Sequence, residues 1–472
     1  MTPSTASSAS STNAPRSDAD IDAPRRLSVA EALASARETK ALEIGPGALA
    51  LTPRVFTAQF PGRAAVVIAD RHTWEVAGKR VQASLNDAKI SVREPFIFDD
   101  PALYAEFGYV EQLISFLQPL DAVPVAVGSG TINDLVKLAS GRMNRPYLSV
   151  ATAASMDGYT AFGASITYHG AKQTFDCPAP QAVVADTDVL CAAPPEMTAS
   201  GYADLQAKIT AGADWILADA LEVEPIERRA WDIVQGGLAE ALADPAGARA
   251  GKPTAIAPLT EGLMLGGFAM QWTKSSRPAS GAEHQFSHLW DMEHHVHGDS
   301  APAHGFKVGI ATLAITSLYE CLLRQPIEQL DVAACVARWP DLKSVEEQVH
   351  RLFSSSDFLE TALTETRAKH LSSDALRRQL ELLKQRWPSI RTRLERQLVP
   401  FTELKRRLRE VGAPAEPEEI GITRPRLRAS FERALHIRRR FTVLDVATRT
   451  GLLAPCLDTL FGANGVWASP RS

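Results

Sequence analysis

The pattern that most constrains the fold is an alternation of short apolar runs with longer amphipathic stretches. It begins at about Arg63, where the run AAVVIA precedes an amphipathic stretch from Thr73 to Ala88. The runs EPFIF and Val123 to Val127 each lead into a segment with helical spacing, and a further run covers Tyr147 to Val150. Continuous apolar strands that alternate with helices are typical of βαβ units. The first half of the chain is therefore predicted to be an α/β domain with a parallel sheet.

The spacing changes after Asp188. Before it, two short runs joined at His169-Gly170-Ala171 predict a hairpin, and Ala182 to Ala185 predicts a last strand. Beyond it, long stretches with helical spacing take over, at Glu196 to Asp219, Pro225 to Leu242, Thr260 to Trp272 and Ala282 to Glu293. We expect a disordered leader over residues 1–26, an α/β domain over 27–190 and a helical domain over 191–472.

Composition excludes several classes of protein. The 472 residues carry 50 basic and 55 acidic side chains, so the net charge of -5 provides no overall field to hold a nucleic acid. The five cysteines form no CxxC motif, which disfavours a disulfide framework and a thiolate zinc site. The apolar runs singled out, such as Ala64 to Ala69, are far shorter than the roughly 20 residues that cross a bilayer. We expect a cytoplasmic protein without a membrane partner.

The string VPVAVGSGTINDLVK is the first candidate site. A strand that ends in glycines and turns directly into a helix presents backbone N–H groups and the positive end of the helix dipole to an anion. Gly128 and Gly130 would let a pyrophosphate approach closely. The spacing is neither GxGxxG nor the Walker pattern, so an ordinary strand–helix connection is the alternative. Asp70 follows the strand AAVVIA, where it would accept hydrogen bonds from a ribose hydroxyl or cap a helix.

A histidine cluster is the most informative feature. Six of the 11 histidines lie within a short segment: His284, His288, His294, His295, His297 and His304. His284 and His288 are spaced i,i+4 and so share a helix face, and His304 stands where a turn opens the next helix. Two imidazoles and a carboxylate suit a divalent ion with open positions, although a histidine-rich surface loop is the alternative.

The carboxylate ligand is not determined by spacing. Asp204 is the preferred candidate, because it shares a helix face with Lys208 and would place a ligand beside a cation. An exposed i,i+4 ion pair is the alternative for these two residues.

Two basic segments are also candidates for binding an anion. The string SRPASGAEH surrounds Arg277 and Ser280 with small and hydroxylated residues, which suit a phosphate or, alternatively, a helix entry that contains a proline. Farther on, the chain from Lys384 to Arg449 is rich in Lys and Arg. Solvated faces of amphipathic helices explain this richness, and a docking face for an acidic partner is the alternative.

Taken in order, the strings GSGTIND, ATAASMDGY, ADLQAK, SRPASGAEHQFSH and APAHG resemble the glycerol-1-phosphate dehydrogenases, a branch of the metal-dependent polyol and alcohol dehydrogenases. The resemblance covers about Leu42 to Ile310. It implies the dehydroquinate synthase-like, iron-containing alcohol dehydrogenase fold. In that fold an N-terminal dinucleotide-binding α/β domain precedes an all-α domain, and the active site lies between them. The boundary placed near residue 190 agrees with this organisation.

The resemblance also implies roles for individual residues. It makes Asp204, His284 and His304 the metal ligands and turns Asp157 and His288 toward the substrate. Its cofactor contacts would be Asp70, Gly128, Gly130, Thr131, Ile132, Asn133, Asp134, Thr152, Ala153, Ala154 and Ser155. The chain departs from the family at two positions. Ala161 replaces a usual serine and removes one cofactor hydrogen bond, and Ala203 replaces a usual glycine.

The implied reaction is the reversible reduction of dihydroxyacetone phosphate to sn-glycerol 1-phosphate by NAD(H) or NADP(H). A divalent zinc, nickel or iron ion would act as a Lewis acid. Asp204 and His288 are the predicted catalytic residues, with His288 or a water touching it supplying the proton. Lys208, Arg277 and Ser280 are the candidates for the substrate phosphate.

Alternatives remain open. One is a dehydroquinate-synthase-like sugar phosphate cyclase, and another is a dehydrogenase of a different polyol or polyol phosphate. A third is a non-catalytic metal- or nucleotide-binding protein on the same scaffold. The expected partners are a small phosphorylated substrate and further copies of the chain in a homo-oligomer.

Overall fold

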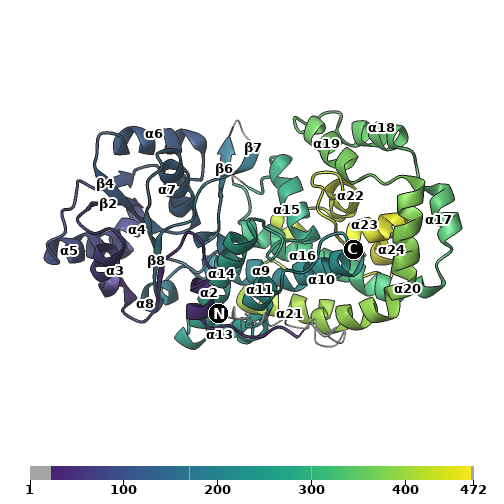
Figure 1. Cartoon of the computed structure of the whole chain (residues 1–472), viewed down its shortest axis with the longest axis horizontal. Helices are drawn as coiled ribbons and strands as arrows, with labels where there is room; N and C mark the ends of the chain where they lie inside the picture. Colours follow the sequence, from purple (N-terminus) through teal and green to yellow (C-terminus); the bar gives the residue numbers. More distant parts are fainter. Residues whose placement is uncertain (1–22, 169–170, 299, 469–472) are drawn as a thin grey trace, which may run out of the picture.

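The computed structural model describes residues 23–168, 171–298 and 300–468. An α/β half lies beside a helical half, which confirms the predicted fold class (Figure 1). The α/β half is built on a parallel sheet of six strands in the order β1-β8-β5-β4-β2-β3. In chain order these are β1 Ala41–Gly45, β2 Ala64–Asp70, β3 Phe96–Phe98, β4 Ala122–Gly128, β5 Leu148–Ala151 and β8 Ala182–Asp186. Most of the predicted leader, residues 1–22, lies outside the described part of the chain.

Helices cover both faces of this sheet, which explains why its central strands are apolar throughout. They are α3 Thr52–Gln59, α4 Arg71–Thr73, α5 Lys79–Asp87, α6 Phe107–Leu117, α7 Gly130–Arg142 and α8 Thr187–Cys191, with a π-helical segment Trp74–Gly78 before α5. Val67 of β2 packs with α3 and α5 on one face, while its neighbours Val66 and Ile68 pack with α6 and α7 on the other. The period-2 alternation of a strand thus gives each face an apolar partner.

A two-stranded antiparallel hairpin separates the halves. It consists of β6 Ala164–Tyr168 and β7 Ala171–Phe175, and it stands at the upper edge between the halves (Figure 1). The sequence predicted this hairpin within one residue at each strand. It did not predict β1, whose residues are all half-buried and include the polar Glu43. An edge strand of this kind lacks the continuous apolar run that marks the central strands.

The second half consists of helices from α9 onward. They are α9 Pro195–Gln206, α10 Lys208–Ala220, α11 Arg228–Gln235, α12 Leu238–Ala241, α13 Pro245–Arg249, α14 Pro253–Thr273, α15 Ala282–Met292, α16 His304–Leu323, α17 Val332–Arg338, α18 Leu342–Phe353, α19 Leu359–Lys369, α20 Ser373–Gln397, α21 Phe401–Val411, α22 Arg424–Ala434, α23 Val443–Arg449 and α24 Leu453–Phe461. The predicted helix over Glu196 to Asp219 is interrupted at Ala207, between α9 and α10.

One large core joins these helices. It also includes Leu27, Ala32 and Ala36, which lie in or beside α2 Val29–Leu33. The start of the described chain therefore packs with the helical half, although the prediction assigned residues 27–190 to the α/β domain. An amphipathic pattern near an end of the chain predicts that one face of the segment is buried. It does not specify which half of the molecule covers that face.

α16 is the described helix that is long and apolar enough to cross a membrane by length and composition. Its apolar window is 83% buried inside the molecule, so here it is a central core helix.

Candidate active site

The carboxyl ends of three neighbouring strands form the first part of the site. β4 pairs with β2 on one side and with β5 on the other. The chain continues from β2 outward to β3, and from β4 in the opposite direction to β5, so a topological switch point lies between β2 and β4. Open α/β sheets bind ligands at such points. Asp70, Gly128 and Thr152 all stand at this edge of the sheet, and the backbone N–H of Thr152 donates to the carbonyl of Gly128 over 3.2 Å.

The N-terminus of α7 is the anion-binding feature predicted from the glycine turn. Its N-cap residue, Ser129, makes no side-chain capping hydrogen bond, so the first-turn N–H groups have no side-chain cap. This arrangement suits a pyrophosphate. The side chains of Ile132 and Asn133 are buried, and Asn133 accepts a hydrogen bond from Tyr147 over 3.2 Å. These two residues therefore face the protein and have only their backbone to offer a cofactor.

Asp70 caps a helix, which was the alternative to a ribose contact in the sequence analysis. Its carboxylate accepts a 2.8 Å hydrogen bond from the backbone N–H of Thr73 and caps α4. A ribose contact for Asp70 stays a prediction. Among the other predicted cofactor residues, Ala153 and Ala154 are buried, and the carbonyl of Ala153 accepts from the hydroxyl of Tyr159 over 2.8 Å.

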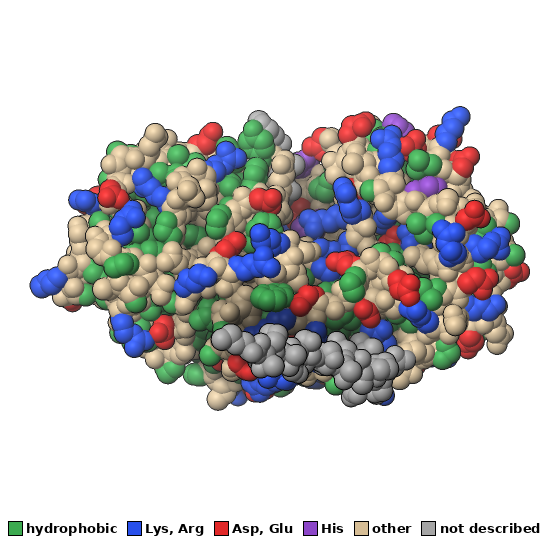
Figure 2. All heavy atoms as spheres, viewed as in Figure 1, with side chains coloured by type: hydrophobic (Ala, Val, Ile, Leu, Met, Phe, Trp, Pro, Cys, Tyr) green, Lys and Arg blue, Asp and Glu red, His purple; other side chains and the backbone are tan. Residues whose placement is uncertain are grey.

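Three helices of the second half bring the predicted metal ligands together. Asp204 lies near the end of α9, His284 in the first turn of α15, and His304 is the first residue of α16. One ligand atom from each lies within 4.8 Å of the other two. The imidazole rings of His284 and His304 are 5.5 Å apart between centroids. Figure 2 shows histidine side chains in the groove between the two halves. A carboxylate and two imidazoles at this separation match the donor set of a divalent metal site.

Two glycines explain how the elements approach so closely. A Cβ at Gly305, directly after His304, would lie 1.9 Å from the carbonyl oxygen of Ser200 on α9. A Cβ at Gly201 would lie 2.0 Å from the carbonyl oxygen of Ala154. The first contact holds the start of α16 against α9, and the second holds α9 against the loop after β5. The metal ligands are thereby fixed beside the carboxyl edge of the sheet.

A buried charge cluster surrounds Asp204. The ammonium group of Lys208 lies 2.9 Å from the Oδ1 atom of Asp204 and 2.7 Å from the Oδ2 atom of Asp157. The backbone N–H of Asp157 donates to the other Asp204 oxygen over 3.1 Å. Burial opposes ionisation of Asp204, but the charge of Lys208, with His284 and His304 close by, holds its pKa well below the usual range. Burial and repulsion by Asp204 raise the pKa of Asp157.

Glu283 is a site residue that the sequence analysis missed. Its Oε1 atom lies 2.8 Å from the Nδ1 atom of His284, and its Oε2 atom accepts from the hydroxyl of Thr210 over 2.8 Å. A carboxylate on Nδ1 sets the tautomer that leaves Nε2 as the ligand atom. Despite burial, which opposes the charge, the hydrogen bond from His284 lowers the pKa of Glu283. The motif GAEH contained this signal, because the acidic residue directly precedes the histidine.

Asp214 is a second missed residue, and it fixes the start of α15. Its carboxylate is fully buried and accepts from the N–H groups of Ala282 and Val443, over 2.7 and 2.8 Å, and from the hydroxyl of Tyr319 over 2.6 Å. Burial, with repulsion from Glu283, raises the pKa of Asp214 to about 7. The string ITAGADW gives no indication of this role, since the donors come from distant segments.

The four remaining histidines of the predicted cluster fall into two groups. His288 is half-buried, and its ring centroid lies 6.3 Å from those of both His284 and His304. In contrast, His294 pairs with Asp357 at the surface, and His295 bonds to the carbonyl of Ile420 over 2.7 Å. His297 is exposed and lies beside Gly421. The last three histidines are therefore packed against the C-terminal part of the chain rather than at the metal ligands.

The structure does not favour Arg277 as a phosphate ligand. Its side chain is 1% exposed, and its guanidinium donates to the carbonyls of Phe441 and Asp214 over 2.9 Å each. Lys208, another candidate, is enclosed between its two carboxylates. A different arginine, Arg440, donates to the carbonyl of Ser280 over 2.6 Å and to the hydroxyl of Ser276 over 2.8 Å. Burial, with repulsion from Arg277 and Arg438, lowers the pKa of Arg440 to about 9.

Comparisons with known proteins agree with this geometry. The family model for iron-containing alcohol dehydrogenases matches residues 43–194. A glycerol-1-phosphate dehydrogenase (NAD(P)+) from Halalkalibacterium halodurans is 37% identical over 265 residues, which cover 56% of this chain and 66% of that protein. One from Geobacillus thermodenitrificans is 33% identical over 296 residues, which cover 61% of this chain and 73% of that protein. The chain belongs to the glycerol-1-phosphate dehydrogenase family.

The solved structures agree on the fold. A probable glycerol dehydrogenase from Sinorhizobium meliloti superimposes with a TM-score of 0.57 at 16% identity, covering 89% of this chain and 98% of that one. Family membership confirms the resemblance stated from the motifs, and with it the prediction that the chain is an oxidoreductase of this class.

Proposed function

We propose that the chain catalyses the reversible reduction of dihydroxyacetone phosphate to sn-glycerol 1-phosphate with NADH or NADPH. The observation that carries this proposal is the convergence of Asp204, His284 and His304, whose ligand atoms lie within 4.8 Å of one another. They do so beside the carboxyl edge of a nucleotide-type sheet, in a chain of this family. The reaction transfers a hydride to the carbonyl carbon and a proton to the carbonyl oxygen, so charge and atoms balance.

Asp204, His284 and His304 would hold the metal ion, and three protein ligands leave positions open for substrate. A zinc, nickel or iron ion fits this donor set. When bound, the metal supplies Lewis acidity to the substrate carbonyl, and the reduced nicotinamide supplies the hydride. The N-terminus of α7 would receive the pyrophosphate of the cofactor, and Thr152 and Ser155 would lie beside it on the neighbouring strand end.

The surrounding residues position the ligands. Lys208 and the backbone N–H of Asp157 fix the two oxygens of Asp204, at 2.9 and 3.1 Å. Glu283 orients His284 through its 2.8 Å contact with Nδ1. His288 projects from the same helix as His284, close enough to the ligands to give and take the substrate proton.

The phosphate group of the substrate needs a cation that is not paired with a carboxylate, as Lys208 and Arg277 are. Arg440 is our proposal, because it lies against Ser276 and Ser280, in the segment that leads into α15 and His284. The side chain of Gln285 donates to the carbonyl of Arg440 over 3.3 Å and joins this loop to the helix of the metal ligands. A guanidinium in this place would bind phosphate as a charged fork.

The remaining predictions concern the setting of the enzyme. We propose a small phosphorylated ketone or polyol as the substrate, action in the cytoplasm, and assembly into a homo-oligomer. No part of the reaction requires nucleic acid or a membrane.

The deciding experiment combines metal analysis of the purified protein with NADH oxidation. We expect a stoichiometric divalent metal and turnover with dihydroxyacetone phosphate that exceeds turnover with dihydroxyacetone. His284→Ala should lose both the metal and turnover, whereas His294→Ala, which alters an exposed histidine, should retain both. A stoichiometric metal in His284→Ala would refute the assignment of the ligand.

The same assay separates the alternatives. A dehydroquinate-synthase-like cyclase regenerates its cofactor, so it would not consume NADH in a lasting way. A non-catalytic nucleotide-binding protein would bind NADH tightly and turn over none of a panel of polyols and polyol phosphates.

A further inference from the structure

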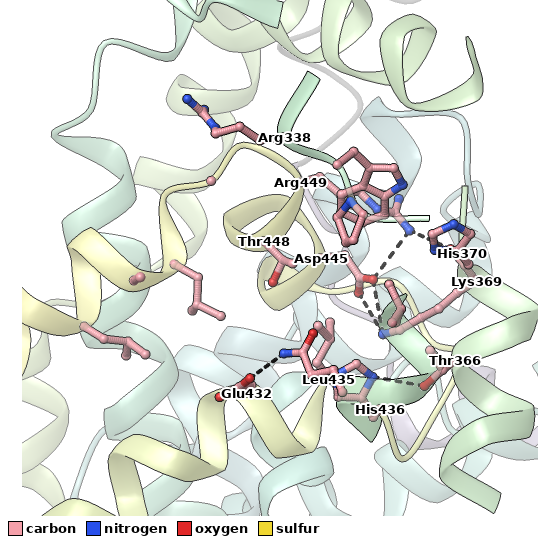
Figure 3. Close-up of a pocket in the computed structure, with 18 of the residues that line it drawn as sticks. Arg338, Thr366, Lys369, His370, Glu432, Leu435, His436, Asp445, Thr448 and Arg449 are labelled. Carbon is pink, nitrogen blue, oxygen red and sulfur yellow. Dashed lines mark hydrogen bonds and ion pairs between the residues drawn. The ribbon is translucent and has the colours of Figure 1, made fainter. Parts of the chain in front are cut away.

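A second cavity lies within the helical half, away from the metal ligands. It has a volume of about 680 Å³ and is walled by α17, α18, α19, α22, α23 and α24 (Figure 3). None of Asp204, His284 and His304 lines it. Its volume is in the range of roughly 300 to 1,000 Å³ that is typical of sites for organic ligands. Its walls come from residues 335–370 and 425–457, which only in part overlap the basic segment Lys384 to Arg449.

One end of the cavity holds more positive than negative charge. The ammonium group of Lys369 lies 3.1 Å from Asp445, and the guanidinium of Arg449 lies 3.6 Å from the same carboxylate. The other hydrogen bonds of Arg449 go to the side chain of Gln379 and the carbonyl of Lys369, which carry no charge. One carboxylate therefore faces two buried cations. Figure 3 shows this group together with His370, while Glu432 lies at the other end of the cavity.

Burial disfavours the charged form of three groups on this wall. Burial lowers the pKa of Lys369 and also that of Arg449, although Asp445 opposes both shifts. Burial, with repulsion from Lys369, lowers the pKa of His436 on the same wall to about 4. All three groups are thus less stable in their charged form than they are in water. An anion in the cavity would reverse this penalty.

Two further groups on the wall have hydrogen-bonding capacity to spare. The Oγ1 atom of Thr448 is buried and has no hydrogen-bond partner among the described residues. Arg338, on α17, forms no ion pair with any residue in the described ranges; its guanidinium donates to the sulfur of Cys335 over 3.7 Å, and Figure 3 shows it directed away from Asp445 and Lys369. Buried polar atoms in proteins are normally satisfied, so the Oγ1 atom of Thr448 points to a ligand or a water.

Part of the remaining lining is apolar and flat, although Gln348, Arg428 and Glu432 also line the cavity. The rings of Trp339 and His370 stack with centroids 5.5 Å apart and an interplanar angle of 14°. Leu435, Leu453 and Leu457 contribute aliphatic surface from α22 and α24. Inorganic phosphate would leave this surface uncovered, and an uncharged hydrocarbon would not balance the excess of positive charge around Asp445.

We propose that this cavity binds an organic anion in which a carboxylate or phosphate group is joined to an apolar or aromatic body. The anionic group lies beside Lys369 and Arg449 and accepts a hydrogen bond from Thr448. The apolar body lies against Trp339 and the leucines. This binding site is separate from the catalytic centre and does not depend on the proposed reaction.

The test uses the fluorescent probe 8-anilinonaphthalene-1-sulfonate with the full chain, in saturating NAD+ so that the nucleotide crevice is blocked. We expect one bound probe per chain. The dissociation constant should rise at least tenfold in Lys369→Met and in Arg449→Met, and stay unchanged in Arg396→Met, which alters an exposed cation outside the cavity. N-phenyl-1-naphthylamine, which has the same rings without the sulfonate, should bind wild type and Lys369→Met equally.

A second set of variants locates the site. Ala454→Trp fills the cavity from α24 and should abolish binding of the sulfonate probe. Wild-type affinity in Ala454→Trp, or in both Lys369→Met and Arg449→Met, would overturn the proposal. Ala454 is exposed, so its variant remains informative if the substitution of Lys369 or Arg449 prevents folding. Displacement of the probe by phenyl phosphate or by phenylacetate then distinguishes a phosphate from a carboxylate ligand.

Discussion

Substitution of Gly305 by alanine tests whether the approach of α16 to α9 builds the metal site. The added Cβ would lie 1.9 Å from the carbonyl oxygen and 2.6 Å from the carbonyl carbon of Ser200. Because real Cβ contacts are essentially never shorter than 3.0 Å, the start of α16 must move by about 1.1 Å. Overpacking of this kind costs about 1 to 3 kcal/mol of stability. A displacement of about 1 Å at reacting groups lowers the rate about 100-fold.

The control for this variant is Gly309→Ala, one helical turn farther along α16. A Cβ there would lie 3.1 Å from the side chain of Ala203, so a shift of a few tenths of an ångström accommodates it. We expect Gly305→Ala to fold with a lowered melting temperature, to lose most of its metal by elemental analysis, and to reduce dihydroxyacetone phosphate at least 100-fold more slowly. Gly309→Ala should retain its metal and most of its activity. Full metal content and wild-type turnover in Gly305→Ala would show that the close approach does not position His304.

Three further predictions address other parts of the molecule. Glu283→Gln should weaken metal affinity about 10- to 100-fold, measured by competition with a chelator, because His284 loses a charged partner on Nδ1; unchanged affinity would mean that Glu283 only stabilises the fold. Arg440→Gln should raise KM for dihydroxyacetone phosphate at least tenfold and leave KM for dihydroxyacetone unchanged, and an equal rise for both would remove Arg440 from the phosphate site. His436 has a folded pKa of about 4 against 6.5 when unperturbed, so the stability that it contributes is present above pH 6.5 and is lost as the pH falls toward 4. The shift corresponds to about 3 kcal/mol as an upper bound. Chemical denaturation at pH 7.5 and pH 4.5 should therefore show a smaller loss of unfolding free energy in His436→Leu than in wild type, and equal losses would contradict the depressed pKa.

The local sequence was sufficient to predict most of the architecture, because the spacing of apolar residues shows which faces of a strand or helix are buried. The run AAVVIA is apolar on both faces since α3 and α5 cover one side and α6 and α7 the other. The same reasoning placed β4, β5, β8 and the hairpin close to their observed positions. It did not predict β1, a half-buried edge strand, or α2, whose residues join the core of the helical half.

The sequence predicted those parts of the candidate site whose functional residues lie close together along the chain. The i,i+4 pair of histidines, the following His-Gly and the Asp-Lys helix made Asp204, His284 and His304 candidates, and the family resemblance selected them as the ligands. One ligand atom from each lies within 4.8 Å of the other two. Their convergence depends on close backbone contacts at Gly201 and Gly305, whose neighbours come from distant parts of the chain.

The role of a long basic side chain could not be predicted where several binding partners are within its reach. Arg277 stands among small and hydroxylated residues, as a phosphate ligand would, yet its guanidinium is enclosed by the carbonyls of Asp214 and Phe441. The basic segment Lys384 to Arg449 likewise did not predict the second cavity. The walls of that cavity come from six helices, three of which precede this segment, and only folding brings them together. Apolar periodicity and the order of motifs depend on residues that are close in sequence, so the sequence alone determines them. Burial of a charge depends on segments up to hundreds of residues apart, and folding alone brings these together.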